Sequence, residues 1–309
     1  MSEKHRVEVP AELAGVRVDR VLAQLSDLSR AKSQDLIGSG AVTINGEPIT
    51  RGDVLAEGDV IEYLVAREVA ALQAEDVAFG VAYEAEDVIV IDKPPGLVVH
   101  PGAGHASGTL VNGLIARFPE LGILGEQYRW GLVHRLDRDT SGLLLVARTA
   151  EMHAFLQQEL KARRIERTYV ALVVGALDAA TGTVDAPVGR DPQRPTRMAV
   201  VQDGRPARTH YRRLAEWPDV TLVELSLETG RTHQIRVHLS SIGLGIVGDP
   251  TYGRGLTAPG GVGRVWLHAR RLRFAGMEGR RHEVVAPLPI DLRQGLVALG
   301  EPSAGIVEI

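Results

Sequence analysis

Cysteine is absent from this 309-residue chain, which excludes disulfide bonds and zinc sites built on thiolates. Long apolar stretches are also missing, since no run reaches the roughly 18 residues typical of a membrane-spanning helix. The N-terminal residues Met-Ser-Glu-Lys-His-Arg contain no apolar signal core. These absences predict a cytoplasmic protein that has no membrane partner.

An excess of positive charge is lacking too. The formal net charge is −4 and the isoelectric point is about 6.2, whereas a nucleic-acid-binding domain is usually basic. Net charge averages over the whole surface, however, and local clusters of arginine decide the contacts. Apolar residues are plentiful at 44%, enough for an ordinary globular core, and the length favours two domains.

The central segment Gly131–Gly142 places polar, charged and glycine residues directly before Leu143–Ala147, an apolar run of strand length. Functional side chains commonly lie in such a loop on a rigid scaffold. Asp137 stands between Arg135 and Arg138, and nearby cations lower a carboxyl pKa below its usual value of about 3.9. We therefore expect an ionised carboxylate that can act as a nucleophile. From the residues alone, the alternative is a solvated aspartate in an ordinary turn.

A second polar segment, residues 228–239, is expected to pass from a strand into a helix. Thr232 can cap this helix, and Ile235, Leu239 and Ile242 have the spacing of its buried stripe. Arg236 falls on another face and can project into a cleft. No metal site is predicted, because the nearby histidines His233 and His238 have no acidic or thiol partner at a useful spacing.

The remaining patterns divide the chain into a polar lead-in at residues 1–14, a small domain at 15–75 and a larger domain at 76–309. The small domain shows two helical patterns and then short strands around the turn signal Asn45-Gly46. The larger domain opens with the buried-strand run 88–92, after which Lys93 begins a tight turn. Lys93 is expected to neutralise a phosphate or a carboxylate, or to be a simple turn lysine. Residues 181–205 are expected to form an exposed basic loop.

Three segments together resemble one enzyme family. They read His-Arg-Leu-Asp-x-Asp-Thr-Ser-Gly at 134–142, Asp-Lys-Pro-x-Gly-Leu-Val-Val-His-Pro at 92–101 and Gly-Arg-Thr-His-Gln-Ile-Arg at 230–236. They are similar to the signatures of the RluA/RluD-type pseudouridine synthases. The N-terminal pattern, with Val-Thr-Ile-Asn-Gly at 42–46, resembles the alpha-L RNA-binding module. The likeness covers about residues 15–290.

This resemblance implies an α+β fold, in which an N-terminal alpha-L RNA-binding module precedes a catalytic domain. That domain is expected to hold a mixed, mainly antiparallel β-sheet flanked by helices and loops. The implied function is isomerisation of specific uridines to pseudouridine without any cofactor. The expected partner is the RNA of the large ribosomal subunit, and the expected state is a monomer.

The resemblance also assigns roles to residues. Asp137 is the implied nucleophile, and Arg236 is the implied partner of its carboxylate, with Arg231 as the alternative. Tyr169 is expected to stack on the target base and to assist proton removal, although core packing is the ordinary role of a strand tyrosine. Contacts with the catalytic substrate are expected from Arg135, His134, Arg231, His233 and Lys93. In the N-terminal module, RNA contacts are expected from Arg17, Arg20, Arg30, Lys32 and Gln34, which are otherwise solvated helix residues.

Other functions remain open at this point. The substrate can be transfer RNA or another ribosomal site. A non-catalytic RNA-binding protein of ribosome assembly would need only the N-terminal module. A glycoside hydrolase would use two carboxylates, for which Asp137 and Asp139 are candidates, but no cluster of sugar-stacking tryptophans accompanies them.

Overall fold

The chain forms two compact units, Met1–Ala71 and Leu72–Ile309, in a computed structural model. The structure describes residues 2–26, 30–66, 72–102, 104–253, 255 and 259–307, without the side chains of residues 2–4, 31, 32, 65 and 66. Within these ranges, no helix combines the length and the apolar character that crossing a membrane requires. Leu72 and Glu75, expected in the first domain, pack in the second: Leu72 lies against its core and the Glu75 N–H donates to Asn112 O.

The first unit is a small sheet with two helices. Its elements are β1 (Ser2–Glu8), η1 (Ala11–Leu13), α1 (Val18–Leu25), α2 (Arg30–Gly38), β2 (Val42–Ile44), β3 (Glu47–Pro48) and β4 (Val60–Ala66). The strand order is β1-β4-β2-β3, so the expected lead-in is wrong: residues 2–8 pair with β4 along their whole length. The predicted hairpin turn is confirmed, because Asn45 and Gly46 adopt the left-handed φ values of 52° and 89°.

Three of the side chains expected to face RNA share one buried carboxylate. Asp19 is fully buried and accepts hydrogen bonds from Arg17, Arg30 and Gln34, the last at 2.9 Å. The Gln34 bond is the main cause of its lowered pKa. Arg17 and Arg30 nevertheless keep 48% and 54% of their side chains exposed, so the cluster still presents positive charge to solvent. The side chain of Lys32 lies outside the described residues.

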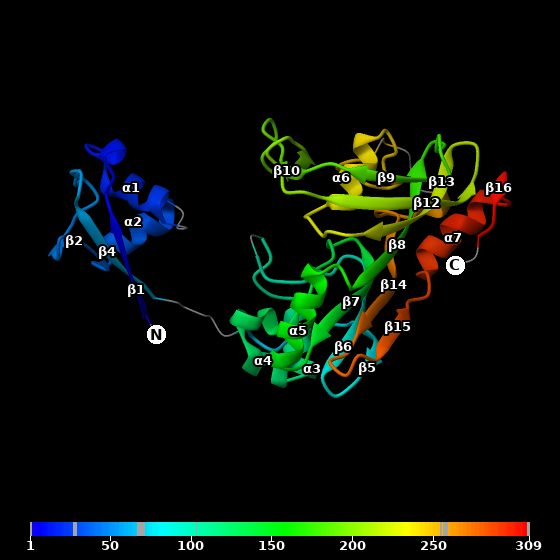
Figure 1. The fold of residues 1–309 in the computed structure, drawn as a ribbon, viewed down its shortest axis with the longest axis horizontal. Coiled ribbons are helices and arrows are strands. Elements are labelled where there is room, and N and C mark those ends of the chain that lie inside the picture. The colour runs from blue at the N-terminus through cyan, green and yellow to red at the C-terminus, as the bar shows by residue number, and fades with distance from the viewer. Residues whose placement is uncertain are drawn as a thin grey trace. The chain divides into compact units, whose positions relative to one another are not determined.

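The second unit is built on one large sheet (Figure 1). Its strands are β5 (Gly80–Glu84), β6 (Val88–Lys93), β7 (Ser141–Ala147), β8 (Glu166–Val174), β9 (Thr181–Asp185), β12 (Arg208–Glu216), β13 (Val220–Leu227), β14 (Leu267–Ala275), β15 (Arg281–Val285) and β16 (Ala304–Gly305). The order is β16-β12-β13-β8-β14-β7-β6-β5, with β15 beside β14 and β9 beside β12. Among the described strands only β7 and β14 pair in parallel, so the predicted mixed, mainly antiparallel sheet is confirmed.

Helices and short elements complete this unit. They are α3 (Leu110–Arg117), α4 (Glu120–Leu124), η2 (Glu126–Gly131), α5 (Ala150–Lys161), α6 (Gln234–Ser241), η3 (Pro259–Gly261) and α7 (Ile290–Leu299). Strands β10 (Val188–Arg190) and β11 (Met198–Val200) form a separate hairpin. The expected exposed loop at 181–205 is therefore wrong in part, because glycine, proline and arginine obscure the alternation of these short strands.

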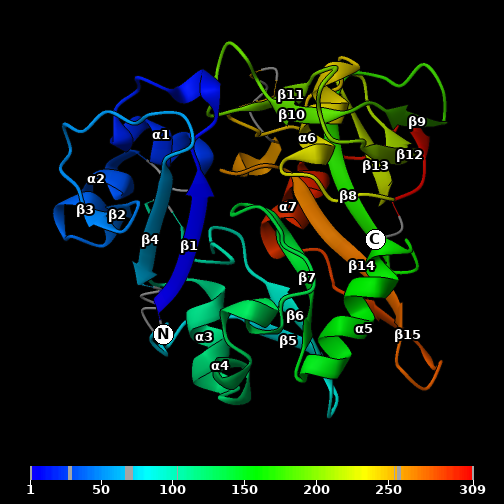
Figure 2. The same cartoon turned by 60° about the vertical axis from the view of Figure 1, so that its left-hand side comes forward.

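The continuous apolar runs of β6 and β7 are explained by cover on both faces of the sheet. Alternate side chains point to opposite faces. Ile89 and Leu144 pack in the core that includes α3, whereas Val90 and Leu145 pack in a second core with Leu156 of α5. Figure 2 shows α3 and α5 on either side of these strands. Because β7 is buried throughout, the loop before it starts from a rigid base.

Gly142, at the start of β7, is a tightly packed point of this scaffold. It pairs with Ala269 of β14 and has a φ of 108°. A Cβ at this position would lie 2.2 Å from Ala269 O, which is main chain and cannot move aside. Only glycine therefore lets β7 and β14 meet directly behind the polar loop.

We predict that Gly142→Ala lowers the free energy of unfolding by about 3 kcal/mol, from backbone strain and overpacking together. Urea unfolding followed by tryptophan fluorescence measures this, because Trp130, Trp217 and Trp266 all lie in the second unit. Gly276→Ala is the control, since the nearest atom to its Cβ would be 3.6 Å away. Equal effects of the two substitutions would contradict the account of this contact.

Candidate active site

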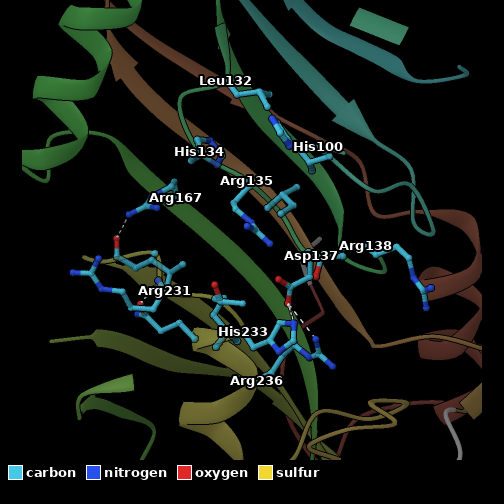
Figure 3. A pocket seen from close by; sticks show the side chains of 18 of the residues that line it. His100, Leu132, His134, Arg135, Asp137, Arg138, Arg167, Arg231, His233 and Arg236 are labelled. Carbon is cyan, nitrogen blue, oxygen red and sulfur yellow. Dashed lines mark hydrogen bonds and ion pairs between the residues drawn. The ribbon is translucent and has the colours of Figure 1, made fainter. Parts of the chain in front are cut away.

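A cleft of about 1260 Å³ opens on the second unit (Figure 3). It is lined by the loop that precedes β7, the end of α5, β8, and the segment from the end of β13 into α6. Eight arginine and lysine residues line it, against four carboxylates. The cleft is therefore basic although the whole chain carries a formal charge of −4. Charge of this sign concentrates anionic ligands.

The loop that carries Asp137 is tied to the scaffold at several points. The Val133 N–H donates to Leu145 O of β7 at 3.1 Å. Lys93, at the end of β6, is fully buried, and its ammonium donates to the carbonyls of Pro94, Leu97 and Arg138 at 2.8, 3.0 and 2.9 Å. Burial lowers the pKa of Lys93 to about 7.

The expectation that Lys93 contacts the substrate is wrong, because its side chain has no exposed surface and its three protons are bound by main-chain carbonyls. Its contact with Arg138 O instead fixes the loop one residue after Asp137. Lys93 is thus a positioning residue for the Asp137 loop.

Asp137 faces an arginine that is itself held from behind. Arg236 of α6 donates from Nη1 to Asp137 Oδ2 at 3.3 Å, as Figure 3 shows. Its Nε and Nη2 donate to the two carboxylate oxygens of Asp249 at 2.6 and 2.8 Å. Asp249 also accepts the N–H groups of Thr251 and Tyr252 at 2.8 and 3.0 Å. The expected pairing of Arg236 with Asp137 is present, and Asp249 fixes the position of the guanidinium.

The opposite charges of Arg236 and its two carboxylate partners, Asp137 and Asp249, attract one another. Burial opposes the charge on Arg236, but the hydrogen bonds that it donates to Asp249 and the charges of Asp249 and Asp137 outweigh this effect and raise the arginine pKa. Burial likewise opposes the charge on Asp249, yet its bonds with Arg236 produce a net lowering of its pKa. Both groups are therefore ionised at neutral pH. The ring of Tyr252 covers the guanidinium, with the Arg236 Cζ 5.0 Å from the ring centroid.

The arginines beside Asp137 in sequence do not hold it as expected. Arg138 turns toward Asp139, with Nε 3.1 Å from Oδ1. Arg135 is exposed, and Figure 3 places its side chain in the cleft near Asp137. The long-range partner Arg236 takes the role expected for these neighbours. Asp139 is engaged by Arg138, which leaves the glycosidase alternative without a free second carboxylate in this loop.

The helix that carries Arg236 begins later than expected. His233, not Thr232, is its N-cap, and His233 has a left-handed φ of 55°, which is uncommon for a residue with a side chain. Its Nδ1 lies 2.9 Å from the Tyr252 hydroxyl, and its Nε2 lies 4.0 Å from Asp137 Oδ2. Burial lowers the pKa of His233, so the ring is neutral. Ile242, expected in the buried stripe, follows the helix and is 42% exposed.

His134 is partly buried and Tyr169 is buried. The His134 Nε2 accepts the N–H of Leu145 at 3.2 Å, and burial lowers its pKa to about 3. This neutral ring joins the loop to β7. Tyr169 lies in the middle of β8, lines the cleft and is 5% exposed; burial raises its pKa, so the phenol is protonated.

Arg231 lies on the rim of the cleft, where its Nε donates to Pro206 O at 3.1 Å. No ion pair joins Arg231 to Asp137 in the described part of the chain, so the geometry favours Arg236 as the partner of that carboxylate. Among the same residues, no three histidine or acidic side chains are grouped as metal ligands would be.

Two residues of the cleft region were missed at the level of sequence. Asp249 lies in the segment Gly-Asp-Pro-Thr-Tyr-Gly at 248–253, whose glycine and proline residues are typical of a loop. Nothing local marks it as the partner of Arg236. Arg167 ends a run of basic residues that follows α5, a pattern typical of an exposed segment, yet it is 7% exposed and lines the cleft. Its position two residues before Tyr169, on the same strand face, was the available signal.

Comparison with known families and proteins agrees with this architecture. The RNA pseudouridylate synthase family model matches residues 87–241, and the S4 domain model matches residues 16–61, which confirms the predicted RNA-binding module. An uncharacterized RNA pseudouridine synthase of Chloroflexus aurantiacus is 48% identical over 94% of this chain and 92% of its own length. Ribosomal large subunit pseudouridine synthase D of Xanthomonas campestris is 43% identical over 100% of this chain and 96% of its own length.

A solved structure supports the same relationship. Human RNA pseudouridylate synthase domain containing 1 aligns with a TM-score of 0.56 and 28% sequence identity, over 70% of this chain and 85% of the human chain.

We predict that Asp249→Asn lowers the free energy of unfolding by about 3 kcal/mol, because it leaves Arg236 buried with a weaker counter-ion. The control is Asp291→Asn. Asp291 forms the same two-bond pair with Arg264, but 42% of its side chain is exposed, so the expected loss is below about 1 kcal/mol.

The pH dependence has a defined sign. The folded-state pKa of Asp249 is depressed, so its stabilising effect is complete above the unfolded value of about 3.9 and is lost as the pH falls below it. Urea unfolding should therefore show a difference between wild type and Asp249→Asn that shrinks in acid. A difference that grows in acid would contradict the ion pair.

Proposed function

The chain belongs to the RNA pseudouridine synthase family, whose members are isomerases, and from this premise we propose that it modifies uridines of large-subunit ribosomal RNA with Asp137 as the nucleophile. The observation that carries the role of Asp137 is its contact with Arg236, which a buried carboxylate fixes in place. The proposed substrate rests on the names of two relatives, one from Xanthomonas campestris and one from Pseudomonas aeruginosa, which specify the large ribosomal subunit. The second is 41% identical over 92% of each chain.

The reaction rearranges one nucleotide. The bond from ribose C1′ to uracil N1 breaks, the base turns, and a bond from C1′ to C5 forms. The proton on C5 leaves and N1 gains a proton, so the atoms balance without a redox partner or a group donor. Asp137 either attacks the sugar or abstracts a sugar proton, and both routes need the carboxylate in its charged form.

Arg236 meets this need in two ways. Its guanidinium places a positive charge 3.3 Å from Asp137 Oδ2, and its hydrogen bond directs that carboxylate oxygen. Because Asp249 and Tyr252 hold the guanidinium from behind, little reorganisation is required when the nucleotide enters. The neutral ring of His233 lies 4.0 Å from the same carboxylate oxygen and adds no competing cation.

The target nucleotide must leave its helical stack before it can reach Asp137, which costs a few kcal/mol. Tyr169 is suited to receive the base, since stacking on an aromatic ring returns about 1–3 kcal/mol. Its raised pKa favours this packing role over that of a ready proton acceptor in the free enzyme. Arg135 is exposed at the cleft and is placed to fill the gap that the extruded base leaves in the RNA.

The wider surroundings fit an RNA substrate. The cleft has a positive balance of charge in an acidic chain, and the S4 unit presents Arg17 and Arg30 to solvent. All residues of the proposed site come from one chain, so a monomer is sufficient for the reaction. We accordingly place the enzyme in the cytoplasm, together with its ribosomal substrate. The names of the relatives favour ribosomal over transfer RNA.

Asp137→Asn is predicted to lower the rate of pseudouridine formation by at least roughly a thousand-fold, while the affinity for RNA changes little. The measurement is nucleoside analysis of an unmodified large-subunit ribosomal RNA transcript after incubation with each protein. Asp139→Asn is the matched control in the same loop and should keep most of the activity. Turnover by Asp137→Asn would overturn the assignment, and released base or sugar would indicate hydrolysis instead.

A further inference from the structure

Arg167 is a buried cation for which no carboxylate partner is found among the described residues. It is 7% exposed, its Nη2 donates to Leu227 O at a long 3.4 Å, and its Nε is buried without any hydrogen-bond partner. Burial lowers the pKa of the guanidinium, as expected when hydration is lost without a compensating anion. Buried charges in proteins are normally paired, so the unpaired guanidinium of Arg167 is suited to bind an anionic ligand.

The carboxylate in the same wall of the cleft is already engaged. Glu228 accepts from Arg163, Arg208 and His210, and its pKa is lowered mainly by the bond from His210. The other charged residues of this wall, Lys161, Arg163 and Arg231, are cations. The surroundings of Arg167 are therefore prepared for a negative ligand from outside the chain.

The guanidinium is also accessible from the cleft. Arg167 and Tyr169 are two residues apart on β8, so both side chains project from one face of the strand, roughly 7 Å apart at the backbone. Gly230 lies over the guanidinium, and a Cβ there would come within 2.8 Å of Nη1. A glycine at this position leaves room for the guanidinium, which a larger side chain would displace. Figure 3 shows Arg167 apart from the pair Asp137 and Arg236.

We infer that Arg167 binds a backbone phosphate of the RNA strand beside the nucleotide that Tyr169 receives. This inference rests on the proposed function. The spacing of the two side chains is about that of one nucleotide, whose base and phosphate would meet the ring and the guanidinium. A phosphate is preferred over a uracil carbonyl because it accepts two parallel N–H bonds and neutralises the charge, which a neutral oxygen does not. The site is separate from the Arg236 pair, whose guanidinium is occupied by two carboxylates.

The test is the salt dependence of RNA binding by full-length Arg167→Gln, with an unmodified large-subunit ribosomal RNA transcript as the probe. Loss of one phosphate contact should reduce the slope of log affinity against log salt by about 0.7–0.9 and weaken binding roughly ten-fold near 0.1 M salt. KM for the transcript should rise with little change in kcat, because the contact is the same in the ground state and the transition state.

Two further variants keep the test decisive. Gly230→Ala retains the charge but displaces the guanidinium, and it should reduce the slope even if Arg167→Gln fails to fold. Arg212→Gln removes a surface arginine of β12 that is 58% exposed, pairs with Glu224 and lies outside the cleft, so its slope should match wild type.

Several outcomes overturn the inference. One is an unchanged slope in both Arg167→Gln and Gly230→Ala. Another is weaker binding with an unchanged slope, which would assign Arg167 to a base carbonyl. A third is a loss confined to kcat and thermal stability, which would make Arg167 structural. The binding slope is read independently of pseudouridine formation. These outcomes are therefore distinguishable from failure of the proposed function, in which the wild-type chain forms no pseudouridine.

Discussion

The site depends on a buried carboxylate that is not itself the proposed nucleophile. Asp249 binds Arg236 through two hydrogen bonds and accepts two main-chain N–H groups, so the guanidinium has one position. From that position it reaches Asp137 across the cleft. Without Asp249, the Arg236 side chain would be free to adopt several rotamers and would lose conformational entropy on contact with Asp137. The pairing with Asp249 fixes the guanidinium of Arg236 before the nucleotide binds. The guanidinium in turn holds the carboxylate of Asp137 in place.

The scaffold supplies the other half of the geometry. Strand β7 is buried throughout and meets β14 through Gly142, so the loop before it has a fixed end. Lys93 and His134 then hold that loop through main-chain groups, and the fully buried Lys93 is not free to contact RNA as expected. These hydrogen bonds give Lys93 and His134 a structural role, although both residues lie in motifs that are expected to contact the substrate. Positive charge toward RNA comes instead from exposed arginines around the rim of the cleft and in the S4 unit.

Much of the fold was predictable from local pattern and resemblance. The apolar runs of β6 and β7, the Asn45-Gly46 turn and the helices α3 and α5 follow from periodicity and turn residues. Strands β1 and β9–β11 were missed because they are short or polar and depend on pairing with distant segments. The same limit applies to the site. Arg236 and Asp137 are 99 residues apart, and their pairing followed only from resemblance. Nothing local marks Asp249 as the partner of Arg236, and Arg167 is marked only by its place two residues before Tyr169 on β8.

The central claim is that Asp249 acts on Asp137 only through Arg236. A double-mutant cycle measures this most directly, with single-turnover rates of pseudouridine formation for Asp249→Ala, Arg236→Ala and the double variant. The account predicts that the double variant is no slower than Arg236→Ala alone, because Asp249 has no further task once the guanidinium is gone. Independent, multiplying losses in the double variant would contradict it and would show that Asp249 contributes to the reaction by another route.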